Sequence, residues 1–539
     1  MKQRAIFAAS AAVLAFAAAP VVRSAPVDGQ TLNRIADAGF NHGEVVDTVE
    51  YLSDQIGGRM TNSPAMRKAE AWTQGKFTGW GLKNVHKEGF EFGRGWWIES
   101  SQVRMVAPRP FELKAIPTAW SPPTNGPVTG QVVVAPIRTE ADFAKWRGKL
   151  KGKVVLISAA TPERDDGEAP FKRLTDVEIG KLDTYRQASF DPAAGAQRAD
   201  RAAFAGKLDA FLSEEGAIAR ASISRSDGRL VHGEGSGYRP GQTPKAPSFE
   251  IAAEDYRRLV RLAKVGDVSL EVNANVHYDD TDTKGYNVIA DIPGSDAKAG
   301  YVMAGAHLDS WVAGDGAADN GAGSAVVMEA ARILASLNVH PKRTIRFALW
   351  SGEEQGLLGS WAYVNEHLAR RPSNELAAKY GPFAGGDTWP IQPLPGLADM
   401  HGYFNIDNGS GRVRGLFAEG NFAAAPVLKE WLAPFASLGA NAVVAQPTGS
   451  TDHVFMVKLG LPAFQFIQDP LDYESRVHHT DLDTFDHLRA DDLRQASVIL
   501  ATLLLDAANA ETPLPNNALP TQPRETNRFK VDEPPPFGR

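Results

Sequence analysis

The second half of the sequence predicts an α/β fold with a mostly parallel, covered sheet. From Tyr286 onward, short apolar runs of strand length alternate with longer amphipathic runs of helix length. The run from Tyr301 to Ala306 is apolar throughout, as expected of a strand that is buried on both faces. Alternating strands and helices favour parallel strands with helices packed on both sides of the sheet.

Five strands and four helices are expected in this half of the chain. The strands are predicted at residues 287–292, 301–306, 344–350, 402–406 and 462–466. The helices are predicted at residues 321–337, 355–367, 422–438 and 491–510. Apolar residues of the first helix fall on one helical face, which is expected to pack on the sheet.

The first 25 residues are predicted to be a secretory signal. Lys2 and Arg4 precede an apolar stretch, Ala5 to Ala19, and small residues follow near Ser24. A retained N-terminal anchor is the alternative, but the stretch is shorter than the about 20 residues that span a bilayer. We therefore expect cleavage near residue 24 or 25, a secreted or periplasmic protein and no stable membrane insertion.

The rest of the chain is divided by its composition. At 539 residues, two to four domains are expected. Residues 26–110 predict helices followed by one strand from Val85 to Trp97, and residues 276–510 carry the alternating pattern. Between them, residues 111–275 are rich in turns and show no acid–histidine cluster with metal spacing, which indicates an inserted, non-catalytic domain. Residues 511–539 form a proline-rich tail, expected to be extended or disordered.

Charge and cysteine content exclude several functions. A net charge of −7 disfavours broad nucleic-acid binding, which needs a basic face. The sequence contains no cysteine, so disulfides, thiolate metal sites and cysteine nucleophiles are excluded. There is also no Gly-x-Ser-x-Gly elbow and no Walker-type loop. Any metal must be held by nitrogen and oxygen ligands.

Polar side chains follow four of the predicted strands or begin the next helix. They are His307, Asp309 and Asp319 after the strand that ends at Ala306, Glu353 and Glu354 after Trp350, Asp407 after Ile406, and His478, His479 and Asp483 beyond Phe466. Because the carboxyl ends of parallel strands meet at one edge of a sheet, these groups are expected to converge. Histidines and carboxylates that converge make a mixed nitrogen and oxygen metal site.

These motifs resemble peptidase family M28, the co-catalytic zinc peptidases. The shared motifs, in chain order, are His307-x-Asp309, Asp319-Asn320-Gly321, Glu353-Glu354, Asp407, His479-Thr480 and Asp483-Thr484. His307 to Trp311 and the His478-His479 pair favour the branch that contains plasma glutamate carboxypeptidase-like enzymes. The resemblance implies a zinc-exopeptidase three-layer sandwich of the phosphorylase/hydrolase-like type. It also implies that residues 111–275 are a smaller, β-rich α/β protease-associated domain inserted into the peptidase.

The resemblance also implies a role for each residue. His307 and Asp407 would bind one Zn²⁺ ion, Glu354 and His479 a second, and Asp319 both. Glu353 would be the general base, because a side chain next to a ligand reaches the attacking water and remains free to take its proton. Asp309, and less clearly Asp483, would orient the imidazole rings of His307 and His479.

The chain departs from the family at one catalytic position. Some members place a tyrosine, which stabilises the oxyanion, directly before the last ligand, and here that residue is His478. An imidazole N–H can donate the same hydrogen bond. The expected activity is an aminopeptidase acting on peptides. A carboxypeptidase, a dipeptidase or a metal-free, receptor-like binding protein on the same fold are the alternatives.

Overall fold

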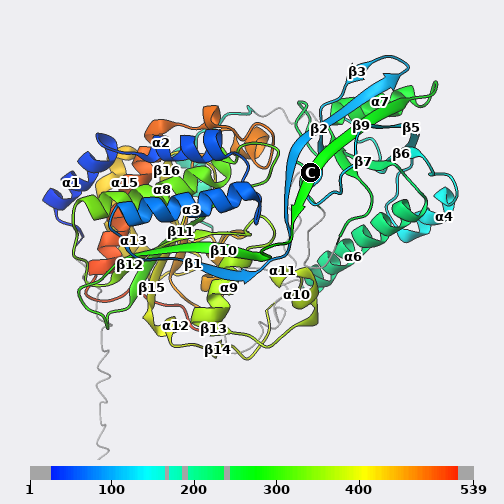
Figure 1. The fold of residues 1–539 in the computed structure, drawn as a ribbon. Helices are drawn as coiled ribbons and strands as arrows, with labels where there is room; N and C mark the ends of the chain where they lie inside the picture. The colour runs from blue at the N-terminus through cyan, green and yellow to red at the C-terminus, as the bar shows by residue number, and fades with distance from the viewer. Residues whose placement is uncertain (1–25, 164–168, 185–191, 236–242, 386, 520–539) are drawn as a thin grey trace, which may run out of the picture.

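The protein is built from two units, each with its own sheet and hydrophobic core (Figure 1). The computed structural model describes residues 26–163, 169–184, 192–235, 243–385 and 387–519. The predicted signal, residues 1–25, lies outside the described residues, as does the end of the tail. Among the residues that the structure describes, no helix combines the length and the apolar character needed to cross a membrane.

The first sheet has a parallel centre and antiparallel flanks. Its eight strands within the described residues are, in spatial order, β1 (Lys83–Glu91), β10 (Lys284–Ile292), β12 (Thr344–Trp350), β11 (Tyr301–His307), β15 (Met400–Asn405), β18 (Ala463–Gln468), β16 (Val413–Phe417) and β17 (Ala442–Val444). Strands β12, β11, β15 and β18 run parallel, whereas β10 and β16 run antiparallel to their inner neighbours. The predicted mixed, mostly parallel sheet is therefore confirmed.

Helices cover both faces of this sheet and complete three layers. One face packs against α1 (Gly29–Phe40), α2 (Val45–Glu50), α3 (Pro64–Gly79), α8 (Ala322–Ser336), α13 (Ala425–Leu432) and α15 (Ala490–Asn509). The other packs against α9 (Leu358–Tyr363), the following helical turn η4 (Val364–Leu368) and α14 (Val454–Val457). Along β11, Val302 and Ala304 face the first layer and Tyr301 and Met303 the second. An apolar run buried on both faces requires two covering layers.

The entry into helix α8 is tied to the end of strand β15. Asn320, in the helical turn η3 (Ala317–Gly321), accepts from the Gly323 N–H at 3.0 Å and donates to the Ile406 carbonyl at 2.9 Å. A side chain at Gly323 would collide with both of these groups. The glycine therefore permits the close approach that holds Asp319 beside the strand ends.

The second sheet forms the right-hand unit of Figure 1. Its eight strands within the described residues are, in order, β3 (Phe111–Glu112), β2 (Gly95–Ala107), β9 (Ser269–Asp279), β5 (Val128–Val134), β6 (Lys153–Leu156), β7 (Ala219–Ile223), β8 (Ser248–Ile251) and β4 (Ala115–Pro117). The helices α4 (Phe143–Trp146), α5 (Asp176–Leu182), α6 (Pro192–Glu214) and α7 (Ala253–Leu262) belong to the same stretch of chain. Strand β2 belongs to this sheet but precedes residue 111, the predicted start of the inserted domain. The bounds of that domain stay a prediction.

The single strand predicted from Val85 to Trp97 is wrong, because the chain changes sheets within it. Strand β1 ends at Glu91 in the first sheet and β2 starts at Gly95 in the second. Gly93, with φ of 126°, makes the turn between them. Buried aromatic side chains lie on both sides of the turn, Phe90 in β1 and Trp96 in β2, so the apolar pattern alone did not reveal the break.

Two further segments pack on the first unit. Lys172, from the second unit, pairs with Leu471, and Arg173 forms ion pairs with Asp469 and Asp492 at 2.9 and 2.8 Å. At the other end of the chain, Leu514 is buried and the Pro515 carbonyl accepts from Asn421. The described start of the predicted tail therefore lies on the first unit without regular secondary structure. The short elements α10 (Glu375–Tyr380), α11 (Pro382–Gly385), α12 (Gly396–Asp399), β13 (Ala369–Arg370) and β14 (Gln392–Pro393) complete this unit.

Candidate metal centre

The predicted polar residues converge at the carboxyl edge of the first sheet. His307 is the last residue of β11, Glu353 and Glu354 follow β12, and Asp407 follows β15. His479 comes from the loop after β18, and Asp319 lies in the helical turn before α8. These elements are parallel neighbours, so their ends meet although the residues are far apart in sequence.

Asp319 stands between the two histidines. Its Oδ1 atom is 3.3 Å from Nε2 of His307, and its Oδ2 atom is 3.2 Å from Nε2 of His479. Asp407 Oδ1 is 3.2 Å from the same nitrogen of His307, and Glu354 Oε2 is 3.0 Å from that of His479. Each histidine therefore has one carboxylate of its own and shares Asp319 with the other.

Both histidines point the same ring nitrogen at this cluster. Nδ1 of His307 is 2.9 Å from the Asp309 carbonyl oxygen, and Nδ1 of His479 is 2.6 Å from Oε1 of Glu234. A carbonyl or carboxylate oxygen only accepts, so in each ring the Nδ1–H donates. Nε2 is thereby left facing Asp319, which is how metal-binding imidazoles are oriented.

The role predicted for Asp309 needs correction, because it is the backbone of Asp309 that holds the His307 ring. The carboxylate Oδ1 is 3.8 Å from His307 Nδ1, beyond hydrogen-bond distance. The carboxylate instead accepts from the backbone N–H groups of Glu353 and Glu354, each at 3.3 Å, and from Thr61 Oγ1 at 3.0 Å. Fully buried, Asp309 fixes the loop that presents the acid pair.

Asp483 likewise lies in the centre but does not orient His479. Its two oxygens accept from the backbone N–H groups of Ala318 and Asp319, at 2.6 and 3.1 Å. It therefore fixes the turn that carries Asp319, while the His479 ring is held by Glu234. Both oxygens of Asp483 face the turn that carries Asp319, and the His479 ring nitrogens face Glu234, Asp319 and Glu354 instead.

Glu353 and Asp452 form a second layer of carboxylates against the cluster. Glu353 Oε2 is 4.0 Å from His307 Nε2, and burial followed by the charges of Asp407 and Asp452 raises the pKa of Glu353 well above its usual range despite the opposing charge of His307. Asp452 is fully buried, and neither of its carboxylate oxygens has a hydrogen-bond partner of good geometry in the described part of the chain. Burial raises the pKa of Asp452 to about 8.

The donor set fits a metal centre. Three groups of side chains bring one ligand atom each to within 4.8 Å of one another: His307 with Glu353 and Asp407, His307 with Asp319 and Glu354, and Asp319 with His478 and His479. Glu354 Oε1 and Asp319 Oδ2 are buried without a well-formed hydrogen bond among the described residues. A cavity of about 10 Å³ lies against Asp319, Glu354 and His479, roughly the room that one water molecule or ion needs.

The charges of the cluster are interdependent. Burial lowers the pKa of His307, but Asp407 and Glu353 outweigh it and leave that pKa well above its usual value. Burial raises the pKa of Asp319, but the adjacent His307 and His479 imidazoles outweigh it and bring that pKa well below its usual value. Burial raises the pKa of Glu354 to about 7. So many titratable groups with perturbed pKa values in one place are typical of a functional site.

His478 is placed at the rim of the centre. Its Nε2 is 3.6 Å from Asp319 Oδ2, and its ring lies 3.8 Å from the His479 ring and 4.8 Å from that of Tyr473. The side chain is 37% exposed, and burial lowers its pKa, so the neutral imidazole is favoured. Burial and the neighbouring carboxylates, Asp319 first among them, raise the pKa of Tyr473 well above 10, which keeps its phenol protonated.

Several residues of the centre were not predicted. Arg59 is fully buried and donates to the carbonyl groups of Leu308, Asp315 and Gly316, so it holds the loop between His307 and Asp319. Thr61, Tyr473, Asp452 and Glu234 were also missed. Arg59 and Thr61 precede any cluster in the sequence, and Glu234 lies in a loop of the other sheet. Of these residues, Asp452 is the one that the sequence could have indicated, since it lies in a polar loop before β18.

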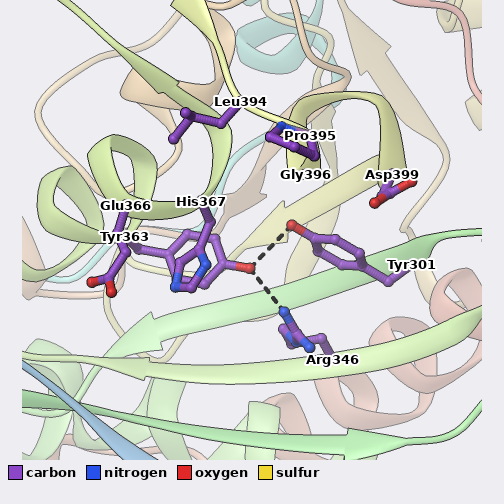
Figure 2. Close-up of a pocket in the computed structure, with 9 residues that line it drawn as sticks. All are labelled: Tyr301, Arg346, Tyr363, Glu366, His367, Leu394, Pro395, Gly396 and Asp399. Carbon is purple, nitrogen blue, oxygen red and sulfur yellow. Dashed lines mark hydrogen bonds between the residues drawn. The ribbon is translucent and has the colours of Figure 1, made fainter.

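A larger cavity of about 440 Å³ lies at the opposite end of strands β11 and β12 (Figure 2). Its lining includes Tyr301, Arg346 and Tyr363. The hydroxyls of Tyr301 and Tyr363 are 3.0 Å apart, and Arg346 donates to the latter at 3.1 Å. Because Tyr301 begins the strand that His307 ends, this cavity is separate from the candidate metal centre.

Comparisons with known proteins agree with the geometry. Residues 287–504 match the profile of peptidase family M28. Carboxypeptidase Q of Rattus norvegicus is 26% identical over 471 residues, which cover 86% of this chain and 85% of that protein. A peptidase M28 precursor from Shewanella amazonensis SB2B has 24% identity and a TM-score of 0.64, covering 91% of this chain and 98% of that one. A zinc aminopeptidase from Bacillus subtilis has 20% identity and a TM-score of 0.55, covering 87% and 95%. These two solved structures share the fold.

Proposed function

This chain belongs to peptidase family M28 and is a hydrolase of the metallopeptidase class, and from that premise we propose that it is a two-zinc exopeptidase that removes N-terminal residues from peptides. His307 and Asp407 would hold one ion, Glu354 and His479 would hold the other, and Asp319 would serve both. The observation that carries this assignment is the position of Asp319, whose two oxygens lie 3.3 and 3.2 Å from the two histidines.

Zinc bound here would lower the pKa of an attacking water and polarise the scissile carbonyl. Nitrogen and oxygen donors of this kind suit Zn²⁺, and the unsatisfied oxygens of Asp319 and Glu354 are those that a cation would engage. The shared carboxylate fixes the spacing of the two histidine sites, because its own backbone is held by Asp483.

Glu353 is the general base in this proposal. Its carboxylate lies beside the cluster, and its backbone is held by Asp309. It takes a proton from the attacking water and returns it to the amine that leaves. The carboxyl that forms in the first half of the reaction is then the proton donor in the second.

His478 is the proposed hydrogen-bond donor to the oxyanion. Its ring lies at the exposed rim and is braced by the rings of Tyr473 and His479. A neutral imidazole has one N–H to donate, and a ring held between two neighbouring rings loses little freedom when it does so. The protonated phenol of Tyr473 lies beside it as a second donor to the same region.

The electrostatics of the centre favour a substrate N-terminus. A carboxypeptidase must hold the substrate's terminal carboxylate with a cation. Arg59 is fully buried and committed to carbonyl groups, and Arg225 is committed to both oxygens of Glu234. The remaining charged groups of the cluster are carboxylates and histidines, which favour a positively charged α-amino group.

A carboxypeptidase or dipeptidase is the second candidate. Carboxypeptidase Q of Rattus norvegicus and that of Bos taurus match this chain over 85% and 86% of their own length, and that name favours cleavage from the C-terminus. The identity of these relatives is 26–27%, which leaves the direction of cleavage open.

Matched peptides with free and blocked ends distinguish an aminopeptidase from a carboxypeptidase. The zinc-loaded protein is given one short peptide with a free N-terminus, the same peptide N-acetylated, and the same peptide C-amidated, and products are identified by mass spectrometry. We expect the free and amidated forms to lose N-terminal residues and the acetylated form to persist. Loss of C-terminal residues from the acetylated form would replace the aminopeptidase assignment with a carboxypeptidase.

The proposed setting is extracellular or periplasmic. We propose that residues 1–25 are a removed signal and that residues 111–275 are a protease-associated domain inserted into the peptidase. The second sheet, which has its own hydrophobic core, supports the proposed inserted domain. N-terminal sequencing of the exported protein tests the first: a start near residue 25 is expected, and a start at Met1 would contradict it.

A further inference from the structure

A loop of the second sheet reaches the candidate metal centre of the first. Glu234, in the connection between β7 and β8, places Oε1 2.6 Å from Nδ1 of His479, across a separation of 245 residues. The same carboxylate accepts from both terminal nitrogens of Arg225, at 2.8 and 2.7 Å. A proposed zinc ligand of one unit is thus held by an acid of the other.

The position of Glu234 is fixed from both sides. Toward the first sheet, the Val231 N–H donates to Asp481 Oδ1 and the Asp481 N–H donates to the Val231 carbonyl, both at 3.0 Å. Toward the second sheet, buried His232 lies 2.7 Å from Glu250 in strand β8, and Glu250 also accepts from the Gly233 N–H at 2.9 Å. The loop is therefore part of the packed interface, and the buried His232 is one of its anchors.

The two histidines of the centre obtain their orientation from different places. For His307 the acceptor is the carbonyl oxygen of Asp309, two residues away in the same loop. For His479 it is a carboxylate from the second unit, Glu234, whereas both oxygens of Asp483 face the turn that carries Asp319. A charged acceptor keeps the ring proton on Nδ1 and increases the basicity of Nε2, the atom that faces Asp319 and Glu354.

We propose that Glu234 is a positioning residue for metal binding, so that the second unit completes the zinc site that the first unit builds. The proposal rests on the two-zinc site proposed above. Arg225 holds the Glu234 carboxylate in place through two parallel hydrogen bonds, and Asp481 docks the loop. Partners of this kind change metal affinity by about 10–100-fold, and the effect should fall on the ion bound by Glu354 and His479.

The test measures zinc affinity in the full chain. Zinc dissociation constants are obtained by competition with a chromogenic chelator for the native protein, Glu234→Gln and Glu234→Ala, together with the melting temperature of each metal-free protein. The matched control is Glu99→Gln, which removes the acid of another glutamate–histidine pair of the second sheet, 2.5 Å from His277 and largely exposed.

The expected result is a weaker second zinc site, about 10–100-fold for Glu234→Ala and less for Glu234→Gln, whose amide oxygen can still accept from Nδ1. Glu99→Gln should bind zinc within about two-fold of the native protein, and the metal-free melting temperature of Glu234→Gln should match that of the control. Native zinc affinity in both Glu234 variants would overturn the proposal while leaving the two-zinc site intact.

Two other outcomes would also overturn it. Suppose that the metal-free Glu234→Gln protein melts well below the control, and that zinc raises its melting temperature by as much as it raises that of the native protein. Glu234 then supports the fold and not the metal site. If the native chain itself binds no zinc, the proposed function fails, and the role of Glu234 fails with it.

Discussion

The two ends of strands β11 and β12 carry polar clusters of similar size but opposite character. At the carboxyl end, Asp319, Glu354 and Asp452 bury carboxylate oxygens without well-formed hydrogen bonds in the described chain. At the amino end, Arg346 binds Asp291 through two nitrogens, at 2.8 and 3.0 Å, and also donates to a tyrosine hydroxyl. The carboxyl end has acceptors left over, whereas at the amino end the buried Arg346 and Asp291 satisfy one another.

This difference distinguishes a site that can bind a ligand or an ion from a network of paired side chains that stabilises the fold. Buried acceptors without donors are costly unless a ligand or ion supplies the missing partner. Paired groups have no such need and stabilise the strands on which they lie. The larger cavity lies at the paired end (Figure 2), so cavity volume alone would direct attention to the wrong end of the sheet.

The largest expected effect is on catalysis, at the carboxyl end. Glu353→Gln keeps the shape of the side chain but removes its ability to take a proton. Turnover should fall by about 10²–10⁴-fold, while zinc content and melting temperature stay near native values. Peptide hydrolysis by the zinc-loaded variant is the measurement, and near-native turnover would show that the base has been misassigned.

The next effect is on stability, at the amino end. Arg346→Met leaves Asp291, which is largely buried, without its cation. We expect the free energy of unfolding to fall by about 3 kcal/mol, with turnover per folded molecule and zinc content unchanged. Urea unfolding followed by tryptophan fluorescence measures the loss. A fall in zinc content in this variant would break the distinction between the two ends.

A smaller loss is expected from Tyr363→Phe. The variant removes the hydroxyl that accepts from Arg346 and lies 3.0 Å from the Tyr301 hydroxyl, but keeps the ring. Stability should decrease by about 1 kcal/mol. The same unfolding assay applies, and a loss as large as that of Arg346→Met would mean that the hydroxyl, rather than the ion pair, holds this network together.

The smallest effect is a pH dependence at the amino end. A hydrogen bond with Glu88 raises the pKa of His367, so the pair stabilises the fold below the unfolded-state pKa of about 6.5 and this contribution is lost as pH rises through the folded-state pKa. His367 is 35% exposed, so solvent screening limits the effect to under about 1 kcal/mol. His367→Gln should be less stable than the native protein at pH 6 and nearer to it at pH 9. An equal difference at both pH values would rule out a titrating pair.

Much of the fold follows from local sequence. The predicted strand at residues 344–350 coincides with β12, and the helix at 491–510 with α15 to within one residue, because long apolar runs with clear periodicity have one favourable way to be buried. Strands β16 and β17 were not predicted. They are short, and β16 contains Arg414 and Gly415, which interrupt an apolar pattern.

The candidate site, too, was predicted only in part. The side chains that face Asp319 were predicted because each follows a strand, and parallel strands bring their ends together. The contacts that orient them were not, because they join residues that no sequence pattern relates: Thr61 with Asp309, Arg59 with the loop after His307, and Glu234 with His479. Such partners are chosen by tertiary packing, which sequence spacing does not encode.

The most direct test of the central claim is the zinc stoichiometry of the carboxyl end. Metal-free protein is equilibrated with zinc, dialysed and measured by inductively coupled plasma mass spectrometry, with Asp319→Ala alongside. We expect two zinc ions per native chain and a clear loss in Asp319→Ala, with peptide hydrolysis returning only when the native chain is loaded. A native chain that retains no zinc, or that hydrolyses peptides equally well without it, would contradict the account and favour a metal-free binding protein or another chemistry at these strand ends.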